Sequence, residues 1–281
     1  MNTLMDTARI QTASTNDITV ELRHVFFSTG SFRILHDVSL RAKTGSAVAI
    51  IGTSGAGKST ILKLILGLIK PDSGEIHVDG EDITGYSEPE LMPVRQKIGM
   101  VFQEGALFDS LTVKENVGYV LYERSGLPED VIDAKVEELL TLVELEEMIN
   151  KMPAELSGGQ KRRVAIARSM AADPKIILYD EPTAGLDPVT SNTILKQMMK
   201  LRDFRGVTTL LVTHKLEDVF KLAYNVALKD GNEIRMVKDA SGQRLHETRI
   251  FMIREGAIEF EGNVDEFQSS NDPNIQEFLS R

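Results

Sequence analysis

The chain has 281 residues, within the range of one large α/β domain, and 42% of them are hydrophobic, enough for a sizeable core without disulfides or metals. Its net charge of −10 disfavours non-specific nucleic-acid binding, which needs lysine and arginine against phosphates, so we expect no nucleic-acid partner. The lack of cysteine excludes disulfides, thiolate zinc sites and cysteine nucleophiles.

The first residues are polar and show no periodicity. Residues 1–17 are expected to be a flexible tail and not a signal peptide, because no basic region precedes an apolar run. The longest dense apolar stretch, residues 61–69, is far shorter than the roughly 20 residues that cross a bilayer. Any link to a membrane is therefore expected to pass through a partner.

Strand-like patterns follow the tail. Residues 18–22 and 38–40 alternate between apolar and polar, and residues 47–51 form an apolar run. A glycine-rich turn then leads into an apolar helix, predicted over residues 58–69 and ended by a Pro- and Gly-containing breaker. Residues 75–79 predict another short strand.

The middle of the chain changes to helical spacing. We interpret residues 104–172 as a helical subdomain inserted into the α/β body. Short apolar runs at 176–179 and 207–212, separated by a helical stretch, are typical of buried parallel strands.

The last part of the chain has three segments. Residues 232–249 are polar and irregular, and we interpret them as a variable insertion, either an extra hairpin or a mobile loop. Residues 250–253 resume a strand, which completes a main domain over 18–262. Residues 263–281 predict a C-terminal helical tail, with the helix over 264–279.

A glycine-rich loop lies between the third predicted strand and the helix after it. It consists of Gly52, Thr53, Ser54, Gly55, Ala56, Gly57, Lys58, Ser59 and Thr60. Strand, loop and helix are the context of a phosphate-binding loop, in which backbone N–H groups and the helix dipole face an anion. Lys58 is expected to reach the β- and γ-phosphates and the Ser59 hydroxyl to ligate Mg²⁺. The alternative is an ordinary glycine-rich turn.

Two acidic residues end the apolar run at 176–179. Ligands bind at the carboxyl ends of strands in open α/β sheets, where Asp180 suits a Mg²⁺ shell and Glu181 a base that orients water. An acidic pair that merely ends a strand is the alternative, and the phosphate-binding loop makes it the weaker one.

A second candidate anion site is the helix start Leu156-Ser157-Gly158-Gly159-Gln160. Ser157 can cap the helix, and two glycines let an anion approach the backbone. Because one chain already has a loop for its own nucleotide, a second site suggests contact with the nucleotide of another chain. The pentapeptide alone is equally compatible with a plain capped helix.

These elements, with three more, resemble the motifs of the ABC ATPase family. The glycine-rich loop resembles Walker A, residues 156–160 match the signature motif, and residues 176–181 resemble Walker B with its catalytic glutamate. Gln103 matches the Q-loop, residues 184–187 are similar to the D-loop, and His214 matches the switch histidine. All six occur in the family's order, so the chain is identified as a member.

The resemblance implies an α/β P-loop NTPase of the ABC ATPase fold, with a mixed sheet core, an N-terminal antiparallel β subdomain and an inserted helical subdomain. It implies ATP hydrolysis with ATP and Mg²⁺ bound. Two chains would close head to tail as a homodimer. Each ATP would lie between Walker A of one chain and Ser157, Gly158, Gly159 and Gln160 of the other.

Further roles follow from the same resemblance. Glu181, His214 and Gln103 would be the catalytic residues, with Gln103 sensing the γ-phosphate and coupling to a membrane partner. The Mg²⁺ ligands would be Ser59, Gln103 and Asp180, and Asp187 would cross the dimer interface. The family's adenine-stacking aromatic is missing, because Thr29 stands at its place, with Phe27 and Phe32 as substitutes.

Within the family, residues 103–113, 152–156 and 272–279 resemble ATPases of Mla/Mce-type lipid transporters. Gln160 and the length of the 232–249 insertion depart from that branch. The branch implies lipid transport, an integral-membrane permease, a small regulatory subunit, a lipid-binding periplasmic protein and a peripheral position on the cytoplasmic side of the inner membrane. The alternatives are an ATPase of another importer or exporter, and a soluble ABC ATPase without a transport role.

Overall fold

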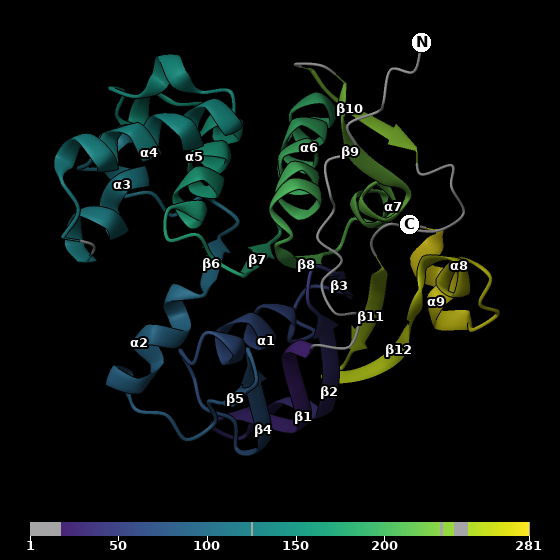
Figure 1. Ribbon diagram of the computed structural model, residues 1–281. Coiled ribbons are helices and arrows are strands. Elements are labelled where there is room, and N and C mark those ends of the chain that lie inside the picture. The colour runs from purple at the N-terminus through teal and green to yellow at the C-terminus, as the bar shows by residue number, and fades with distance from the viewer. Residues whose placement is uncertain (1–17, 125, 231–232, 239–246, 281) are drawn as a thin grey trace, which may run out of the picture.

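The computed structural model describes residues 18–124, 126–230, 233–238 and 247–280 (Figure 1). The predicted tail over 1–17 lies outside this part of the chain, as does half of the 232–249 insertion. The described helices include none that is long and apolar enough to span a bilayer.

A six-stranded mixed sheet forms the centre of the molecule, in the order β12-β11-β3-β8-β7-β6. Its strands are β3 (Ala47–Ile51), β6 (Ile98–Val101), β7 (Ile176–Asp180), β8 (Thr208–Thr213), β11 (Thr248–Arg254) and β12 (Ala257–Asn263). The strands from β11 to β6 are parallel, and β12 pairs antiparallel with β11. Every residue of β3 and β8 is buried, as expected for strands covered on both faces.

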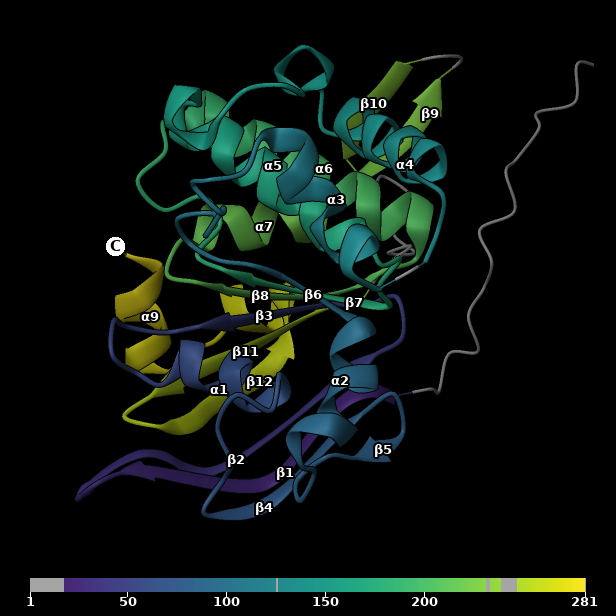
Figure 2. The same cartoon turned by 90° about the vertical axis from the view of Figure 1, so that its left-hand side faces the viewer.

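A four-stranded antiparallel sheet packs below the central one, in the order β2-β1-β4-β5 (Figure 2). It consists of β1 (Ile18–Thr29), β2 (Phe32–Lys43), β4 (Ser73–Val78) and β5 (Glu81–Asp82). The apolar residues Val20, Leu22 and Val25 of β1 are buried, and α1 (Lys58–Ile65) lies between the two sheets in one hydrophobic cluster with them.

Helices cover the other face of the central sheet (Figures 1 and 2). They are α3 (Val113–Arg124), α4 (Glu129–Leu142), α5 (Gly158–Met170), α6 (Pro188–Arg205) and α7 (Leu216–Tyr224), with short 3-10 turns at Glu146–Met148 and Pro153–Glu155, while α2 (Glu88–Gln96) leads into β6. A second hydrophobic cluster joins these helices to the sheet. The mixed central sheet, the antiparallel sheet and the inserted helices confirm the predicted fold class.

The helix after the glycine-rich loop is shorter than predicted. It ends at Ile65, not at residue 69, because Gly67 adopts a left-handed φ of 63°. A β-carbon on Gly67 would lie 2.6 Å from Leu91 Cδ2, so α2 packs directly on this turn. Leu66 and Ile69 keep their hydrophobic contacts, which is why the apolar pattern continues past the end of the helix.

The 232–249 insertion is a strand over residues 233–238, where the structure describes it. Strands β9 (Asn225–Asp230) and β10 (Glu233–Lys238) pair antiparallel as a hairpin, the first of the two open alternatives, and β11 already begins at Thr248. The hairpin packs partly on the helical cluster through Ile234 and Met236.

The predicted helix over 264–279 is interrupted. It forms two short helices, α8 (Val264–Gln268) and α9 (Pro273–Leu279), because Asp272 caps a new helix whose first residue is Pro273. Phe267, Ile275 and Phe278 pack in the same cluster as the helices on the central sheet.

Candidate functional site

The glycine-rich loop joins β3 to α1 at the carboxyl edge of the central sheet. Gly52 and Gly57 have φ values of 156° and 102°. A β-carbon would lie 2.2 Å from the Ile253 carbonyl oxygen at Gly52, and 2.6 Å from Leu35 Cδ2 at Gly57. These two positions therefore require glycine, and the loop curls tightly around the start of α1.

Lys58 is buried at the first position of α1. Its Nζ donates to the carbonyl oxygens of Gly52 and Thr53, at 2.9 Å each. Burial lowers the pKa of Lys58, while the Glu181 and Asp180 carboxylates act against that shift. The ammonium thus lies over the loop with few partners, ready to exchange carbonyl contacts for phosphate oxygens.

Ser59, in the first turn of α1, meets Asp180 at the end of β7, where Ser59 Oγ donates to Asp180 Oδ1 at 3.0 Å. Burial raises the pKa of Asp180, and the hydrogen bond from Ser59 opposes it. The described residues hold no cluster of three or more acidic, histidine or cysteine side chains that could bind a metal by themselves. One carboxylate and one hydroxyl suit Mg²⁺, which takes most of its ligands from water and phosphate.

Glu181 and His214 form a direct contact next to this pair. His214 Nδ1 lies 2.9 and 2.8 Å from the two carboxylate oxygens of Glu181. Glu181 follows β7 and His214 follows β8, which are neighbouring parallel strands. Glu181 also has a φ of 48°, a conformation that is uncommon for a residue with a side chain.

These side chains open into one cavity of about 1150 Å³. Its lining includes Gly52, Thr53, Ser54, Gly55, Gly57, Lys58, Ser59, Thr60, Gln103, Glu181 and His214. The sequence-predicted loop residues, apart from Ala56, therefore line one space with Gln103, Glu181 and His214. The cavity continues along α7 toward Phe278 and Leu279 of α9.

Ser157 lies at the start of α5, away from this cavity. It accepts a hydrogen bond from Gln160 N at 3.3 Å, and Gln160 Oε1 accepts one from Ser157 N at 2.8 Å. Among the described residues that line the cavity, none belongs to 157–160. The pentapeptide is thus a capped helix start in its own chain, in which Gly158 is exposed to a ligand from outside and Gly159 is buried against Thr190.

Asp187 caps another helix, α6, by accepting hydrogen bonds at 3.0 Å from the backbone N–H groups of Val189 and Thr190. Its expected position across a dimer interface stays a prediction. Phe27 packs with the hydrophobic cluster under β1, while Phe32 is 75% exposed at the end of the β1–β2 hairpin. Neither lines the cavity in the described part of the chain.

Three polar residues near Glu181 were missed by the sequence analysis. Thr183 and Asp218 are buried and hydrogen-bonded to each other, and Lys215 Nζ donates to the Thr183 carbonyl oxygen at 2.8 Å. No motif marks them. The available signal was an acidic residue one helical turn after His214, on the apolar face of a short helix.

Comparison with known proteins shows the family and the fold of this chain. The sequence pattern of the family described as "ABC transporter" matches residues 35–184. A solved ATP-binding cassette, MJ0796, described as a dimer in a post-hydrolysis state bound to ADP and Pi, superimposes with a TM-score of 0.73 at 34% identity. The alignment covers 87% of this chain and 98% of that one.

Two named relatives differ in what they suggest about cargo. Protein TRIGALACTOSYLDIACYLGLYCEROL 3, chloroplastic, of Arabidopsis thaliana is 40% identical over 94% of this chain and 74% of its own length. Methionine import ATP-binding protein MetN of Latilactobacillus sakei is 43% identical over 78% of this chain. This chain spans 62% of the length of that methionine import protein, less than two thirds.

Proposed function

The chain belongs to the ABC transporter family and is an ATPase of it, and we propose that it works as the ATP-hydrolysing subunit of a membrane transporter. The observation that carries the proposal is the meeting of Lys58, Glu181 and His214 around one cavity at the ends of neighbouring strands. Asp180 does not line the cavity but accepts a hydrogen bond from Ser59, which does. Such an arrangement positions and polarises a terminal phosphate.

Each residue has a distinct part in the proposed reaction. Lys58 exchanges its two carbonyl contacts for β- and γ-phosphate oxygens. Mg²⁺, held by Ser59 and Asp180 with Gln103 close to the γ-phosphate, supplies charge neutralisation when bound. Glu181 accepts a hydrogen bond from the attacking water and orients it, and His214 holds that carboxylate while it contacts the γ-phosphate.

The proposed base is tested by Glu181→Gln, which keeps the shape and removes the negative charge. The variant binds ATP and dimerises, but its turnover falls by about 10²- to 10⁴-fold, because general-base contributions have that size. Turnover and ATP affinity are measured on the same preparation. Turnover within twofold of wild type would contradict the role of Glu181.

A second chain completes each site in this proposal. Ser157, Gly158 and Gly159 start a helix outside the chain's own cavity, where the helix dipole and free backbone N–H groups favour an anion. A head-to-tail homodimer brings them to the partner's nucleotide, and Asp187 then lies at the interface.

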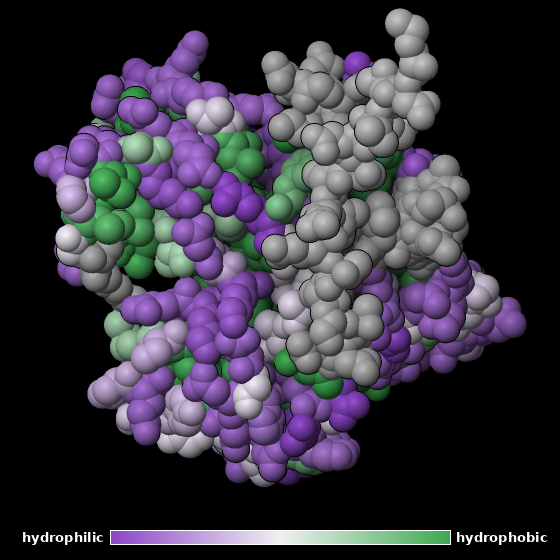
Figure 3. Space-filling view, viewed as in Figure 1, coloured by the Kyte–Doolittle hydropathy of each residue, from purple (hydrophilic) through white to green (hydrophobic). Residues whose placement is uncertain are grey.

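A membrane permease is the proposed partner of the helical region. Several large hydrophobic side chains are exposed there, and Figure 3 shows part of this apolar surface over α3. They are Phe108, Tyr119, Tyr122, Leu127 and Val131. The Phe108 and Tyr119 rings stack at 4.7 Å between centroids, a few residues after Gln103, so a docked permease would be in direct reach of the phosphate sensor.

The named relatives favour the alternative expectation, another importer, over the lipid expectation. MetN proteins of several organisms match this chain at 42–46% identity. A small amino acid such as methionine is therefore the first candidate cargo. A lipid is the second, and the observation that favours it is coverage, because the relative named after a glycolipid aligns with 94% of the chain.

One reconstitution separates the cargos. The chain is purified together with its permease from detergent-solubilised membranes. The complex is then reconstituted into lipid vesicles, with the ATPase chain on the side to which ATP is added. Methionine with its binding protein stimulates ATP turnover if the first candidate is right, and labelled phospholipid moves between vesicles if the second is. Copurification also shows whether a small regulatory subunit and a periplasmic lipid-binding protein accompany it. A chain without any membrane partner would contradict the transporter role.

A further inference from the structure

Asp218 is a buried carboxylate that the proposed mechanism does not use. It lies on α7, four residues after His214, and is 3% exposed. We propose that Asp218 and Lys215 are positioning residues that hold Glu181 in its hydrolytic conformation through Thr183. The inference rests on the proposed role of Glu181 as the base.

The backbone of Glu181 needs such support. Its φ of 48° lies in the left-handed region, which a glutamate rarely adopts, and such conformations persist only where surrounding contacts fix them. Two backbone contacts hold the residue from β8 and from its own turn: Glu181 N donates to Val212 O at 2.9 Å, and Ala184 N donates to Glu181 O at 3.1 Å. The second contact ties the chain beyond Pro182 to Glu181 through Ala184, but neither contact involves a polar group of Thr183.

Thr183 is fixed at both of its polar groups. Its Oγ1 donates to Asp218 Oδ2, and its carbonyl oxygen accepts from Lys215 Nζ at 2.8 Å. Lys215 is itself placed by a hydrogen bond from its backbone N–H to Thr213 Oγ1 at 3.0 Å. Thr183, two positions after Glu181, is therefore bonded to residues 215 and 218 of the segment that follows β8.

The same short segment also contacts the Glu181 side chain, through His214. Residues 214–218 thus hold the Glu181 carboxylate and the Thr183 backbone and hydroxyl together. We call residues 214–218 the clamp. Because α7 follows β8 directly and packs beside β3 and α6, a shift of His214 toward a phosphate moves the whole clamp with it. Glu181 and His214 then stay in register during the reaction.

The burial of the cluster favours positioning over direct chemistry. Thr183 is fully buried. Burial raises the pKa of Asp218, while the Thr183 hydrogen bond and the Lys215 and Lys221 charges oppose that shift. The carboxylate therefore depends on Thr183 and Lys215 for compensation, although Asp218 and Lys215 also belong to the lining of the cavity.

The test compares kcat with ATP affinity. Thr183→Val keeps side-chain size and removes the hydrogen-bond donor, whereas Asp218→Asn keeps size and replaces the charged acceptor with a weaker neutral one. Each lowers kcat by about 10- to 100-fold, the effect of a small misplacement of a catalytic group, while the affinity for ATP stays within about twofold. The double variant falls no further than Thr183→Val alone, because both changes act on one interaction.

Matched variants separate positioning from folding. Thr183→Ser keeps the hydroxyl and retains kcat. Glu217→Gln changes the neighbouring residue of α7, whose side chain is 85% exposed, and also retains kcat. Unchanged kcat in Asp218→Asn overturns the inference, as does an equal loss of kcat and ATP affinity. Failure of both Asp218→Asn and Thr183→Val to fold would also overturn it, because the contact would then be structural.

Glu181→Gln distinguishes this failure from failure of the proposed base. If Glu181→Gln loses turnover and Asp218→Asn does not, the clamp is wrong and the base stands. If Glu181→Gln keeps wild-type turnover, the proposed base itself is wrong. In a Glu181→Gln background, Asp218→Asn causes no further loss of single-turnover hydrolysis.

Discussion

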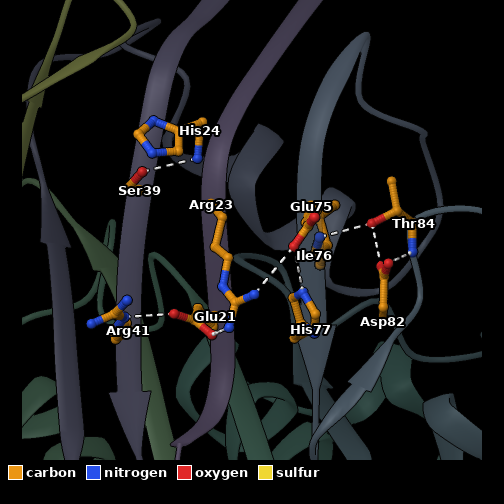
Figure 4. Close-up of polar contacts among 10 residues, drawn as sticks. All are labelled: Glu21, Arg23, His24, Ser39, Arg41, Glu75, Ile76, His77, Asp82 and Thr84. Carbon is orange, nitrogen blue, oxygen red and sulfur yellow. Dashed lines mark hydrogen bonds and ion pairs between the residues drawn. The ribbon is translucent and has the colours of Figure 1, made fainter.

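Two polar clusters of this molecule differ in how their buried charges are compensated. On the outer face of the antiparallel sheet, Glu21 is buried between two arginines, which donate to its carboxylate at 2.7 Å from Arg23 and 2.6 Å from Arg41 (Figure 4). At the edge of the central sheet, Lys58 is buried and Asp180 is partly buried, and both have few and neutral hydrogen-bond partners.

The pKa shifts show which cluster stabilises the fold. The hydrogen bond from Arg23 lowers the pKa of Glu21, so its charged form is favoured in the folded chain. Burial shifts the pKa values of Lys58 and Asp180 in the directions that disfavour their charges. The left-handed Glu181 adds strain of about 1–3 kcal/mol. The strand-end cluster therefore costs stability, as functional sites commonly do.

The largest effect that sharpens this comparison is expected from Lys58→Ala. The loss of a charged contact to phosphate weakens ATP binding by about 10- to 100-fold. Thermal stability is expected to stay the same or rise, because a desolvated ammonium is removed. Calorimetric ATP titration and thermal unfolding measure the two effects. A clear loss of stability with unchanged ATP affinity would reverse the assignment of the two clusters.

A smaller effect is expected where α5 meets α6. A β-carbon on Gly159 would lie 2.2 Å from Thr190 Cγ2, so Gly159→Ala overpacks the junction by about 1–3 kcal/mol. Thr190→Ser removes that methyl group and keeps the hydroxyl that donates to Asp187. We expect the double variant to regain stability in denaturant unfolding. If it regains ATP turnover as well, Gly159 acts by packing alone and its role at a partner's nucleotide is contradicted.

The smallest effect on activity is expected in the antiparallel sheet. Glu21→Gln lowers stability by about 1–3 kcal/mol at neutral pH, the size of hydrogen bonds to a charged group, and leaves turnover per folded chain unchanged. Because the pKa of Glu21 is lowered in the folded state, this stabilisation is present above its unfolded pKa and is lost as the pH falls through the folded value. The free energies of unfolding of wild type and Glu21→Gln are therefore expected to differ at pH 7 and to become equal in strong acid.

Glu75→Gln is the matched control on the same sheet. Glu75 accepts a hydrogen bond from Arg23 at 3.2 Å, but about half of its side chain is exposed. Its removal is expected to leave stability unchanged within error, because exposed ion pairs contribute little. Equal effects of Glu75→Gln and Glu21→Gln would show that burial is not what makes the Glu21 contacts stabilising.

The central site was predictable because its residues follow three adjacent parallel strands. The glycine-rich loop follows β3, Glu181 follows β7 and His214 follows β8, and the strand order is β3-β8-β7. Carboxyl ends of parallel strands share one edge, so residues far apart in the chain had to meet there. The contact between His214 and Glu181 is a consequence of that register.

Other features depended on packing that periodicity does not encode. The bond between Thr183 and Asp218 needs the orientation of α7 against the turn after β7, and the closeness of Gly159 to Thr190 needs the approach of two helices. The early end of α1 depends on one left-handed glycine. The choice between a hairpin and a loop for residues 232–249 stayed open, because the pairing of β10 with β9 is not visible in composition.

The most direct test of the whole account asks whether each site is built from two chains. Lys58→Ala disables the phosphate loop, and Gly158→Asp places a negative charge at the signature helix, where a β-carbon meets nothing closer than 3.7 Å in its own chain. Each variant alone is expected to be inactive. Mixing the two restores ATP turnover, because a hybrid dimer has one site with both intact halves. If turnover stays at the level of the separate variants, the composite site is contradicted.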